Sequence, residues 1–331
     1  MYQVVFYEDK YEKEWDEFVL GKECVNGTFL QSRNFLKYHP KNRFKDSSII
    51  IFNDKHTIIA VCPACTIEEN GQKILFSHKG STYGGLLIRR VYYTTDKVLG
   101  IINAFEQFAI DNGFEKVVLK LTPDLLSVQN TDLLQYMLSY SGYNEYTELS
   151  TYVDLLELKD DIISDLDRNK RRNIKKCIDN DLEFRVLNRE QEIRAFHKLL
   201  TINLTKFNAK PIHTPEEILE FHNSRIPEIV KFYGVFYKGE QVAGGMLFAF
   251  ESMKVLHAQN LSYNLEYTEF SPITFLYYSV IKQAKELGYS KLSWGISTED
   301  QGRTINFGLI RNKESYNSKY SLNRTFYKEL K

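Results

Sequence analysis

The stretches AIDNGFEKVVL (residues 109–119) and AKELGYSKLSW (residues 284–294) carry alanine, glycine, an aromatic residue and lysine at matching positions. In both, a helical pattern ends at the glycine and an apolar strand pattern follows, which is where a left-handed helix terminus favours glycine. Upstream, IIIFNDKHTIIAV (residues 49–61) and GVFYKGEQVAGGM (residues 234–246) share the order strand, polar turn, strand. Together the two pairs predict a duplicated α/β unit.

The hydrophobic periodicity of the two halves predicts similar elements in a similar order. The first half predicts strands at 2–6, 47–53, 57–68, 72–77, 115–121, 143–149 and 151–156, with helices at 11–19, 31–38, 95–112 and 130–140. The second half predicts helices at 161–179, 189–205, 214–224 and 271–287, with strands at 182–187, 229–237, 241–250, 253–262 and 290–296. We therefore expect two domains, residues 1–155 and 156–331.

One helix start is predicted in detail. Thr214, Pro215 and Glu217 occupy the N-cap, first and third positions of the helix expected at 214–224. A threonine cap with a glutamate three residues later forms a capping box, and proline is favoured at the first helical position.

The composition is that of a folded protein whose overall charge does not attract nucleic acid. Of 331 residues, 43% are hydrophobic and 26% are charged, and the formal net charge is zero, so a polyanion site has to be local. The N-terminal sequence mixes acids with bases and no long apolar run follows, so we expect neither a secretory signal nor a membrane span. The four cysteines are too few for a disulfide framework, which indicates the cytoplasm.

Neither the cysteines nor the histidines predict a metal site. Cys62 and Cys65 lie in an apolar, β-branched run, where residues three apart point to opposite faces of a strand. The seven histidines show no metal spacing such as H-E-x-x-H, and no Ser-His-Asp arrangement is visible. We expect a chain without a bound metal.

The element order, taken with four stretches, resembles the FemAB family, whose members are similar to tandem GNAT acyltransferase domains. These stretches are NGTFLQSRNFLKYH (26–39), GSTYGGLLI (80–88), the strand–strand–helix–strand core at 239–297, and FGLIRNKESYNSKYS (307–321). The resemblance implies two tandem GNAT-like domains of mixed α/β fold. It further implies transfer of an acyl or aminoacyl group to an amine, with acyl-CoA or aminoacyl-tRNA as donor. The acceptor would be an amine of a cell-envelope precursor or amino sugar, either nucleotide-linked or a small molecule.

A phosphate site is predicted where the helix at 271–287 begins with Ser271-Pro272. The first turn of a helix offers free backbone N–H groups and the positive end of the dipole, here at Ser271, Ile273 and Thr274. In a GNAT-like domain this turn would hold the pyrophosphate of CoA. The Gly-rich stretch usual before such a helix is absent from NLEYTEFSPIT (264–274), so an ordinary capped helix is the alternative.

A basic helix is predicted at LDRNKRRNIKKC (166–177), the one concentrated basic stretch of the chain. Its apolar residues form one stripe and its cations lie mostly on the opposite arc. Arg171 and Arg172 are candidates to bind the phosphates of a nucleotide-linked acceptor or a tRNA, because the guanidinium group matches phosphate. The alternative is a solvated amphipathic helix.

Several side chains are candidates for the cleft. His257, Gln259 and Tyr263 lie at alternate positions of the strand before Ser271 and could face the substrate, with Tyr263 as a catalytic group and Glu269 as a base. The resemblance gives the first domain the acceptor side and the second the donor side. Acceptor-side candidates are Lys37, Ser81 and Tyr83.

The segment NFGLIRNKESYNSKY (306–320) fits neither the helical nor the strand period. In it, Lys313 falls where the FemAB-like closing segment has its Phe-Lys pair, which implies a role in stabilising oxyanionic or leaving-group charge. Asn312 replaces the aromatic residue of that pair, and Asn317 replaces the glycine that follows.

Two other functions fit the same sequence. One is an acetyl- or acyl-CoA-dependent N-acyltransferase that acts on a small metabolite. The other is a non-catalytic tandem-GNAT binding protein. Binding of CoA, retention of charged tRNA, or neither would separate the three.

Overall fold

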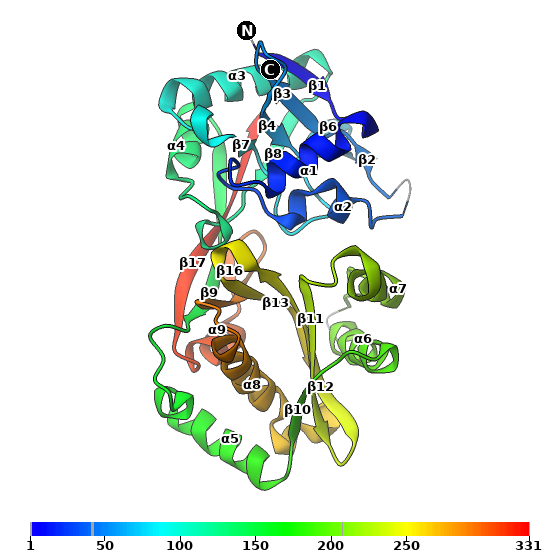
Figure 1. Ribbon diagram of the computed structural model, residues 1–331, viewed down its shortest axis with the longest axis vertical. Helices are drawn as coiled ribbons and strands as arrows, with labels where there is room; N and C mark the ends of the chain where they lie inside the picture. The colour runs from blue at the N-terminus through cyan, green and yellow to red at the C-terminus, as the bar shows by residue number, and fades with distance from the viewer. Residues whose placement is uncertain (1, 41–42, 207, 331) are drawn as a thin grey trace. The chain divides into compact units, whose positions relative to one another are not determined.

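The computed structural model describes residues 2–40, 43–206 and 208–330 (Figure 1). Its contacts divide the chain into two compact units. Unit 1 holds the residues up to Glu148 together with those from Leu322 on, and unit 2 holds Leu149–Ser321. The first break falls after Glu148, whereas the expected boundary lies after residue 155, and a second break falls before Leu322, where the C-terminal segment returns to unit 1.

Unit 1 is built from strands in two sheets, with helices packed on them. Its helices are α1 (Glu12–Leu20), α2 (Arg33–Leu36), α3 (Thr95–Asp111) and α4 (Asp132–Tyr140). One sheet has the order β1-β3-β4-β7, with β1 (Gln3–Phe6), β3 (Ile49–Phe52), β4 (Ile58–Cys62) and β7 (Leu87–Ile88). The other strands have the order β2-β5-β6-β8-β17, with β2 (Lys45–Asp46), β5 (Cys65–Glu69), β6 (Gln72–Ser77), β8 (Lys116–Lys120) and β17 (Ser318–Glu329).

The apolar stripe of α3 forms much of the core of unit 1. Val98, Ile101 and Phe105 follow helical spacing and are fully buried. They belong to one cluster with Val117 and Leu119 of β8. The apolar residues of the duplicated sequence around 109–119 therefore contribute to the core of this unit.

Unit 2 is a mixed sheet with helices on both faces, as Figure 1 shows. The strand order is β10-β11-β12-β13-β14-β9, with β10 (Glu183–Val186), β11 (Val230–Tyr237), β12 (Glu240–Phe250), β13 (Val255–Tyr263), β14 (Lys291–Ile296) and β9 (Asn144–Asp154). Neighbouring strands are antiparallel except for the parallel pair β13–β14. Helices α5 (Arg168–Asp179) and α8 (Pro272–Glu286) lie on one side, and α6 (Glu190–Thr205) and α7 (Pro215–Glu220) lie on the other. After β14 come the hairpin of β15 (Thr298–Glu299) with β16 (Thr304–Ile305) and the helix α9 (Phe307–Glu314).

Several expected elements differ from the structure for local reasons. The strand expected at 57–68 is split into β4 and β5 at Pro63, which has no N–H to donate. The two strands expected at 143–149 and 151–156 are the single strand β9, because the one residue between them, Ser150, is too short a connection for a four-residue turn. The helix expected at 161–179 is interrupted at Leu166, which has extended backbone angles after a 3₁₀ turn.

Among the described residues, no helix combines the length and the apolar character needed to cross a membrane. The four cysteines are buried and unpaired by disulfides. Burial raises the pKa of the Cys62 thiol to about 12, so this thiol is not a nucleophile at neutral pH.

The predicted capping box at the start of α7 is confirmed. The Thr214 Oγ1 accepts from the Glu217 N–H at 3.2 Å, and the Thr214 N–H donates to Glu217 Oε2 at 2.8 Å. We expect Thr214→Ala to lower the free energy of unfolding by about 1 kcal/mol, measured by urea titration. The matched control is Thr94→Ala at the N-cap of α3, where the threonine side chain makes no cap hydrogen bond. Equal losses in the two variants would contradict the role given to the Thr214 side chain.

Candidate functional site

The parallel strands β13 and β14 separate part-way along their length. Their register runs from Val255 opposite Lys291 to His257 opposite Ser293, while β13 continues to Tyr263 and β14 to Ile296. Beyond the last pair, β13 is paired only with β12, and β14 only with β9. Past this point the facing edges of β13 and β14 are not paired with each other, so their backbone hydrogen-bonding groups need other partners.

A bulge in β13 lies directly past the point of separation. Leu247 of β12 pairs with Ala258 and Met246 pairs with Asn260, so Gln259 is the extra residue. Beyond the bulge, each residue of β13 therefore points to the face opposite to the one that strict alternation gives it. Tyr263 consequently packs against the core cluster that includes α8. It pairs with Ala243 of β12, whereas His257 pairs with Phe248, which points to the opposite face of that strand. Strict alternation predicted that His257 and Tyr263 lie on one face of the strand. The structure does not place them on one face.

A second bulge reshapes the end of β14. Ser293 pairs with Tyr152 and Gly295 with Thr151, which leaves Trp294 as the extra residue. Gly295 has φ +70°, a conformation that favours glycine. A Cβ on Gly295 would lie 3.5 Å from His257 Cε1, so this turn and the histidine are neighbours.

Lys313 binds the two peptide carbonyls that this turn presents. Its Nζ donates to the Gly295 carbonyl at 3.0 Å and to the Ile296 carbonyl at 2.6 Å, and the residue is only 3% exposed. Burial lowers the pKa of Lys313 to about 7, and within the described residues no carboxylate pairs with it. At neutral pH both the ammonium and the amine are populated.

The segment around Lys313 is a helix, which corrects the expectation of an aperiodic segment. Asn306 caps α9 by accepting from the Leu309 N–H at 3.0 Å. Only Ile310 and Lys313 are buried in α9, and their spacing of three residues is helical. Because the buried face of α9 includes a lysine, apolar periodicity alone does not reveal this helix.

His257 is a neutral neighbour of this lysine. Its Nδ1 lies 3.0 Å from the Ser293 Oγ at the last paired position of the two strands. Burial, and secondarily the charge of Lys313, lowers the pKa of His257 to about 4. The imidazole is therefore uncharged at neutral pH, and Lys313 is the titrating group of the pair.

Aromatic rings hold α9 against the sheet. Tyr316 stacks on Tyr277 of α8 at 4.9 Å between ring centroids, and Tyr277 lies 4.5 Å from the Trp294 ring. Lys170 of α5 donates to Asn312 Oδ1 at 2.6 Å, and its ammonium lies 4.9 Å from the centre of the Tyr316 ring. These contacts fix the residue that precedes Lys313.

The start of α8 offers fewer free amides than expected. Ser271 has φ +53°, and its N–H donates to the Thr268 carbonyl at 3.0 Å. The Thr274 N–H donates back to the Ser271 carbonyl at 2.9 Å. Of the three expected phosphate donors, Ser271 and Thr274 therefore already have acceptors within the chain, while Ile273 is the remaining candidate.

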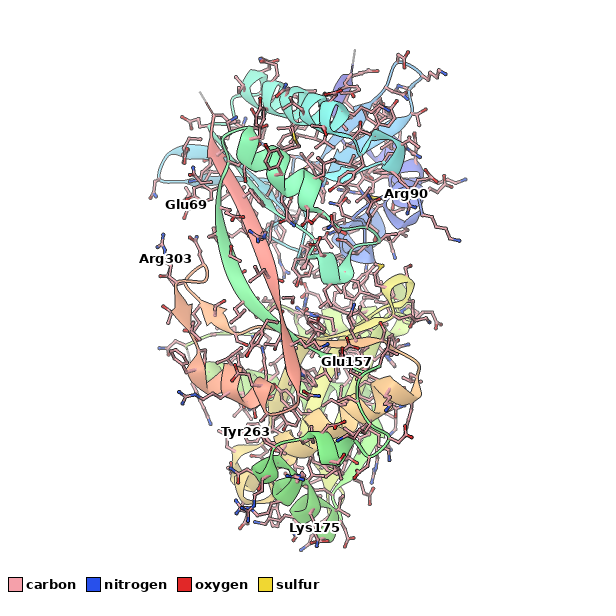
Figure 2. The ribbon with its side chains drawn as sticks, turned by 90° about the vertical axis from the view of Figure 1, so that its left-hand side faces the viewer. Glu69, Arg90, Glu157, Lys175, Tyr263 and Arg303 are labelled. Carbon is pink, nitrogen blue, oxygen red and sulfur yellow. The ribbon has the colours of Figure 1, made fainter. Side chains whose placement is uncertain are left out.

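The basic helix α5 lies beside the start of α8. The Cys177 thiol donates to the Phe270 carbonyl at 3.0 Å, and Lys176 Nζ donates to the Glu269 carbonyl at 2.7 Å. Arg171 and Arg172 are exposed, as is Lys175, which Figure 2 labels on the surface of α5. Within the described residues, no ion pair joins these exposed cations to a carboxylate.

Two predicted catalytic groups lie away from the lysine contacts. The Glu269 side chain is exposed on the 3₁₀ segment Leu265–Phe270. Tyr263, labelled in Figure 2, accepts at its carbonyl from Asn203 Nδ2 at 2.7 Å. Gln259 is half-buried, and its Oε1 has no hydrogen-bond partner in the described part of the chain.

The acceptor-side candidates all lie in unit 1, each in a separate local contact. Lys37 pairs with Glu12 and, at 3.3 Å, with Asp9. The Ser81 hydroxyl donates to the Leu30 carbonyl at 3.0 Å. Tyr83 is buried, and its hydroxyl accepts from Asn323 Nδ2 at 3.2 Å; burial raises its pKa.

Sequence reasoning missed the residues that shape the end of β14, namely Ser293, Trp294, Gly295 and Thr151. A glycine inside an apolar strand pattern, as in KLSWGIS (291–297), is a signal of a bulge and could have indicated this site. Across residues 2–40, 43–206 and 208–330, no three metal-ligating side chains gather.

The comparisons with known proteins concern unit 2 and the fold. Residues 164–301, which lie in unit 2, match the model of the acetyltransferase (GNAT) domain family. No curated protein matches the sequence. The chain is similar to FemX, with 10% identity over 98% of this chain and 96% of that one and a TM-score of 0.69.

Two further solved structures have the same fold. One is the C-terminal domain of a protein assigned as a lysylphosphatidylglycerol synthetase from Agrobacterium fabrum (12% identity, 97% and 92% coverage, TM-score 0.61). The other is a tandem GNAT protein of clavulanic acid biosynthesis (8% identity, 100% and 99% coverage, TM-score 0.59). The expected FemAB-like fold of two tandem GNAT-like domains is therefore confirmed.

The buried lysine makes stability depend on pH in a defined direction. The pKa of Lys313 is about 7 in the folded chain and near 10.5 in the unfolded chain. At a pH between these two values, Lys313 is protonated in the unfolded chain and has lost its proton in the folded chain. We expect the free energy of unfolding of the native chain, relative to Lys313→Met, to rise between pH 7.5 and 9.5 by at most about 1.4 kcal/mol per pH unit.

Urea titrations across this pH range measure the slope. Lys319→Met is the control, because the pKa of Lys319 is raised by its hydrogen bond to Glu157 and no slope arises in that window. A flat difference for Lys313→Met would mean that the lysine is solvated in the folded chain.

Proposed function

We propose that this chain catalyses amide-bond formation, transferring an acyl or aminoacyl group to the amine of a cell-envelope precursor or amino sugar in the cytoplasm. The observation that carries the proposal is the Lys313 ammonium, buried on two carbonyls where β13 and β14 separate. A titrating cation with no carboxylate partner among the described residues suits a reaction in which negative charge develops and a proton moves.

In the proposed reaction the amine nitrogen attacks the acyl carbonyl. The new C–N bond forms, and the donor's C–O or C–S bond breaks. The proton lost by the amine ends on the leaving oxygen or sulfur. Lys313 can stabilise the oxyanion or leaving group as an ammonium, and it can carry the proton because its pKa lies near neutrality. Lys313 suits this role better than Glu269, whose exposed carboxylate has its usual access to water.

The reaction also requires that the donor be held with its acyl carbonyl facing the attacking amine. The edges of β13 and β14 can supply this positioning. Past His257, backbone groups of β13 and β14 can hydrogen-bond a donor; an amide-bearing arm such as that of acyl-CoA could pair with them as a strand would, which is the observation in favour of that second donor. The bulge at Gln259 adds a backbone N–H that is out of register and suits an oxyanion. His257 and Gln259 would then lie beside the acyl group.

Aminoacyl-tRNA is the donor that we favour. Helix α5 presents exposed arginines at positions 171 and 172, and α8 lacks the Gly-rich approach and uses the Ser271 and Thr274 amides internally. One of the similar structures is named for lysylphosphatidylglycerol, a lipid that carries an aminoacyl group. Unit 1, with Lys37, Ser81 and Tyr83, would bind the acceptor.

Acyl-CoA is the second candidate donor, because the matched domain is of the acetyltransferase (GNAT) family and the Ile273 amide still lies at the start of α8. A non-catalytic binding protein is the third possibility. Calorimetry with CoA and filter retention of charged tRNA distinguish the three, since binding of neither donor would favour the non-catalytic protein.

Removal of the lysine tests the mechanism. We expect Lys313→Ala to lower kcat at least tenfold, or about 1.4 kcal/mol of transition-state stabilisation, with the far-UV circular dichroism of the native fold. Arg311→Ala is the matched control, because this exposed residue lies on the same helix and its guanidinium contacts only the Phe307 ring among described partners. Full turnover by Lys313→Ala would refute the catalytic role.

The basic helix is tested by salt dependence. We expect the double variant Arg171→Ala/Arg172→Ala to bind charged tRNA at least about tenfold more weakly at 100 mM salt and to lower the salt slope by about 2. Arg189→Ala/Arg194→Ala removes the same charge from α6, on the other side of the sheet, and should leave both values unchanged. Equal weakening in both variants would indicate a net-charge effect and not a site on α5.

A further inference from the structure

Four buried polar side chains at the end of β14 have no hydrogen-bond partner within the described residues. They are Trp294, through its Nε1, and the hydroxyls of Thr151, Ser297 and Thr298. Their exposed fractions are 5%, 0%, 1% and 7%, respectively. Thr151 lies opposite Gly295 in the register of β9 and β14, and the Ser297 N–H donates to the Leu149 carbonyl of β9 at 2.8 Å, so these residues are neighbours where β9 and β14 meet; Thr298 follows in the chain.

Such a group is unusual in a folded chain, because buried polar atoms almost always find partners. The other tryptophan of the chain shows the normal case. Trp15 is also buried, and its Nε1 donates to the Gln31 carbonyl at 2.9 Å. The indole of Trp294 thus has a donor to offer that the described residues do not use.

Three of these residues flank, in the sequence, the backbone groups that bind Lys313. The carbonyls of Gly295 and Ile296, which accept from Lys313 Nζ, lie in the chain between Trp294 and Ser297. The Trp294 ring is held by Tyr277, with 4.5 Å between centroids, so its N–H has a fixed direction. Polar groups in fixed positions next to a reacting centre select ligands that complete their hydrogen bonds.

We propose that the end of β14 binds the side chain of the transferred group, and that this group carries a neutral hydrogen-bonding substituent such as a hydroxyl or a carboxamide. The proposal rests on the proposed acyl transfer and adds the class of acyl group. One N–H donor and three hydroxyls complement such a substituent, whereas a hydrocarbon side chain leaves all four unpaired. A cationic substituent is disfavoured beside the Lys313 ammonium.

The two tryptophans provide a direct readout without any need for activity. In ¹H–¹⁵N spectra the chain gives two indole signals, which Trp294→Phe assigns. The probes are L-serinamide and L-asparaginamide, with L-2-aminobutyramide as the apolar isostere of serinamide. We expect serinamide or asparaginamide, at up to about 50 mM, to shift the Trp294 signal in a saturable way while the Trp15 signal stays in place.

The matched variant is Thr151→Val, which keeps the shape of the side chain and removes the hydroxyl. We expect it to weaken serinamide binding roughly tenfold and to leave 2-aminobutyramide binding unchanged. An unmoved Trp294 signal, an equal response to the isostere, or equal shifts of both indoles would each overturn the inference. If the native chain transfers no acyl group from either donor while Trp294 responds as expected, the binding site stands and the proposed function fails. If the native chain transfers an acyl group and the Trp294 signal does not move, the function stands and this inference fails.

Discussion

The short parallel pairing of β13 with β14 is the constraint on which the site depends. It stops at His257 and Ser293, and each strand then continues beside a different neighbour. A bulge follows in each strand at that point, at Gln259 in one and at Trp294 in the other. The open edges, the turned carbonyls of β14 and the unpartnered indole all follow from this separation.

A lysine can stay in this interior because backbone oxygens replace water around its ammonium. The two carbonyls of β14 supply hydrogen bonds without supplying a full negative charge, so burial still displaces the pKa downward. A carboxylate in the same place would have held the lysine charged. The absence of a described carboxylate partner therefore distinguishes Lys313 from the ion-paired Lys37 of unit 1.

The sequence predicted the repeated elements and the capping box well, because both depend on local patterns such as the helix termini at Gly113 and Gly288. It predicted Lys313 only through a family resemblance, since a buried cation breaks the apolar period of α9. The phase of β13 could not be predicted, because a bulge depends on the partner strand. Trp294 looked like an ordinary core residue until the partners of its N–H were known.

The C-terminal strand has a consequence for how the chain is made. From Leu322 on, β17 belongs to unit 1 and pairs with β8, although all of unit 2 comes before it in the sequence. During synthesis, unit 1 therefore cannot be completed until β17 has been made, and by then unit 2 has emerged and can fold. The long loop that this closure requires should make completion of unit 1 the slower event in refolding as well.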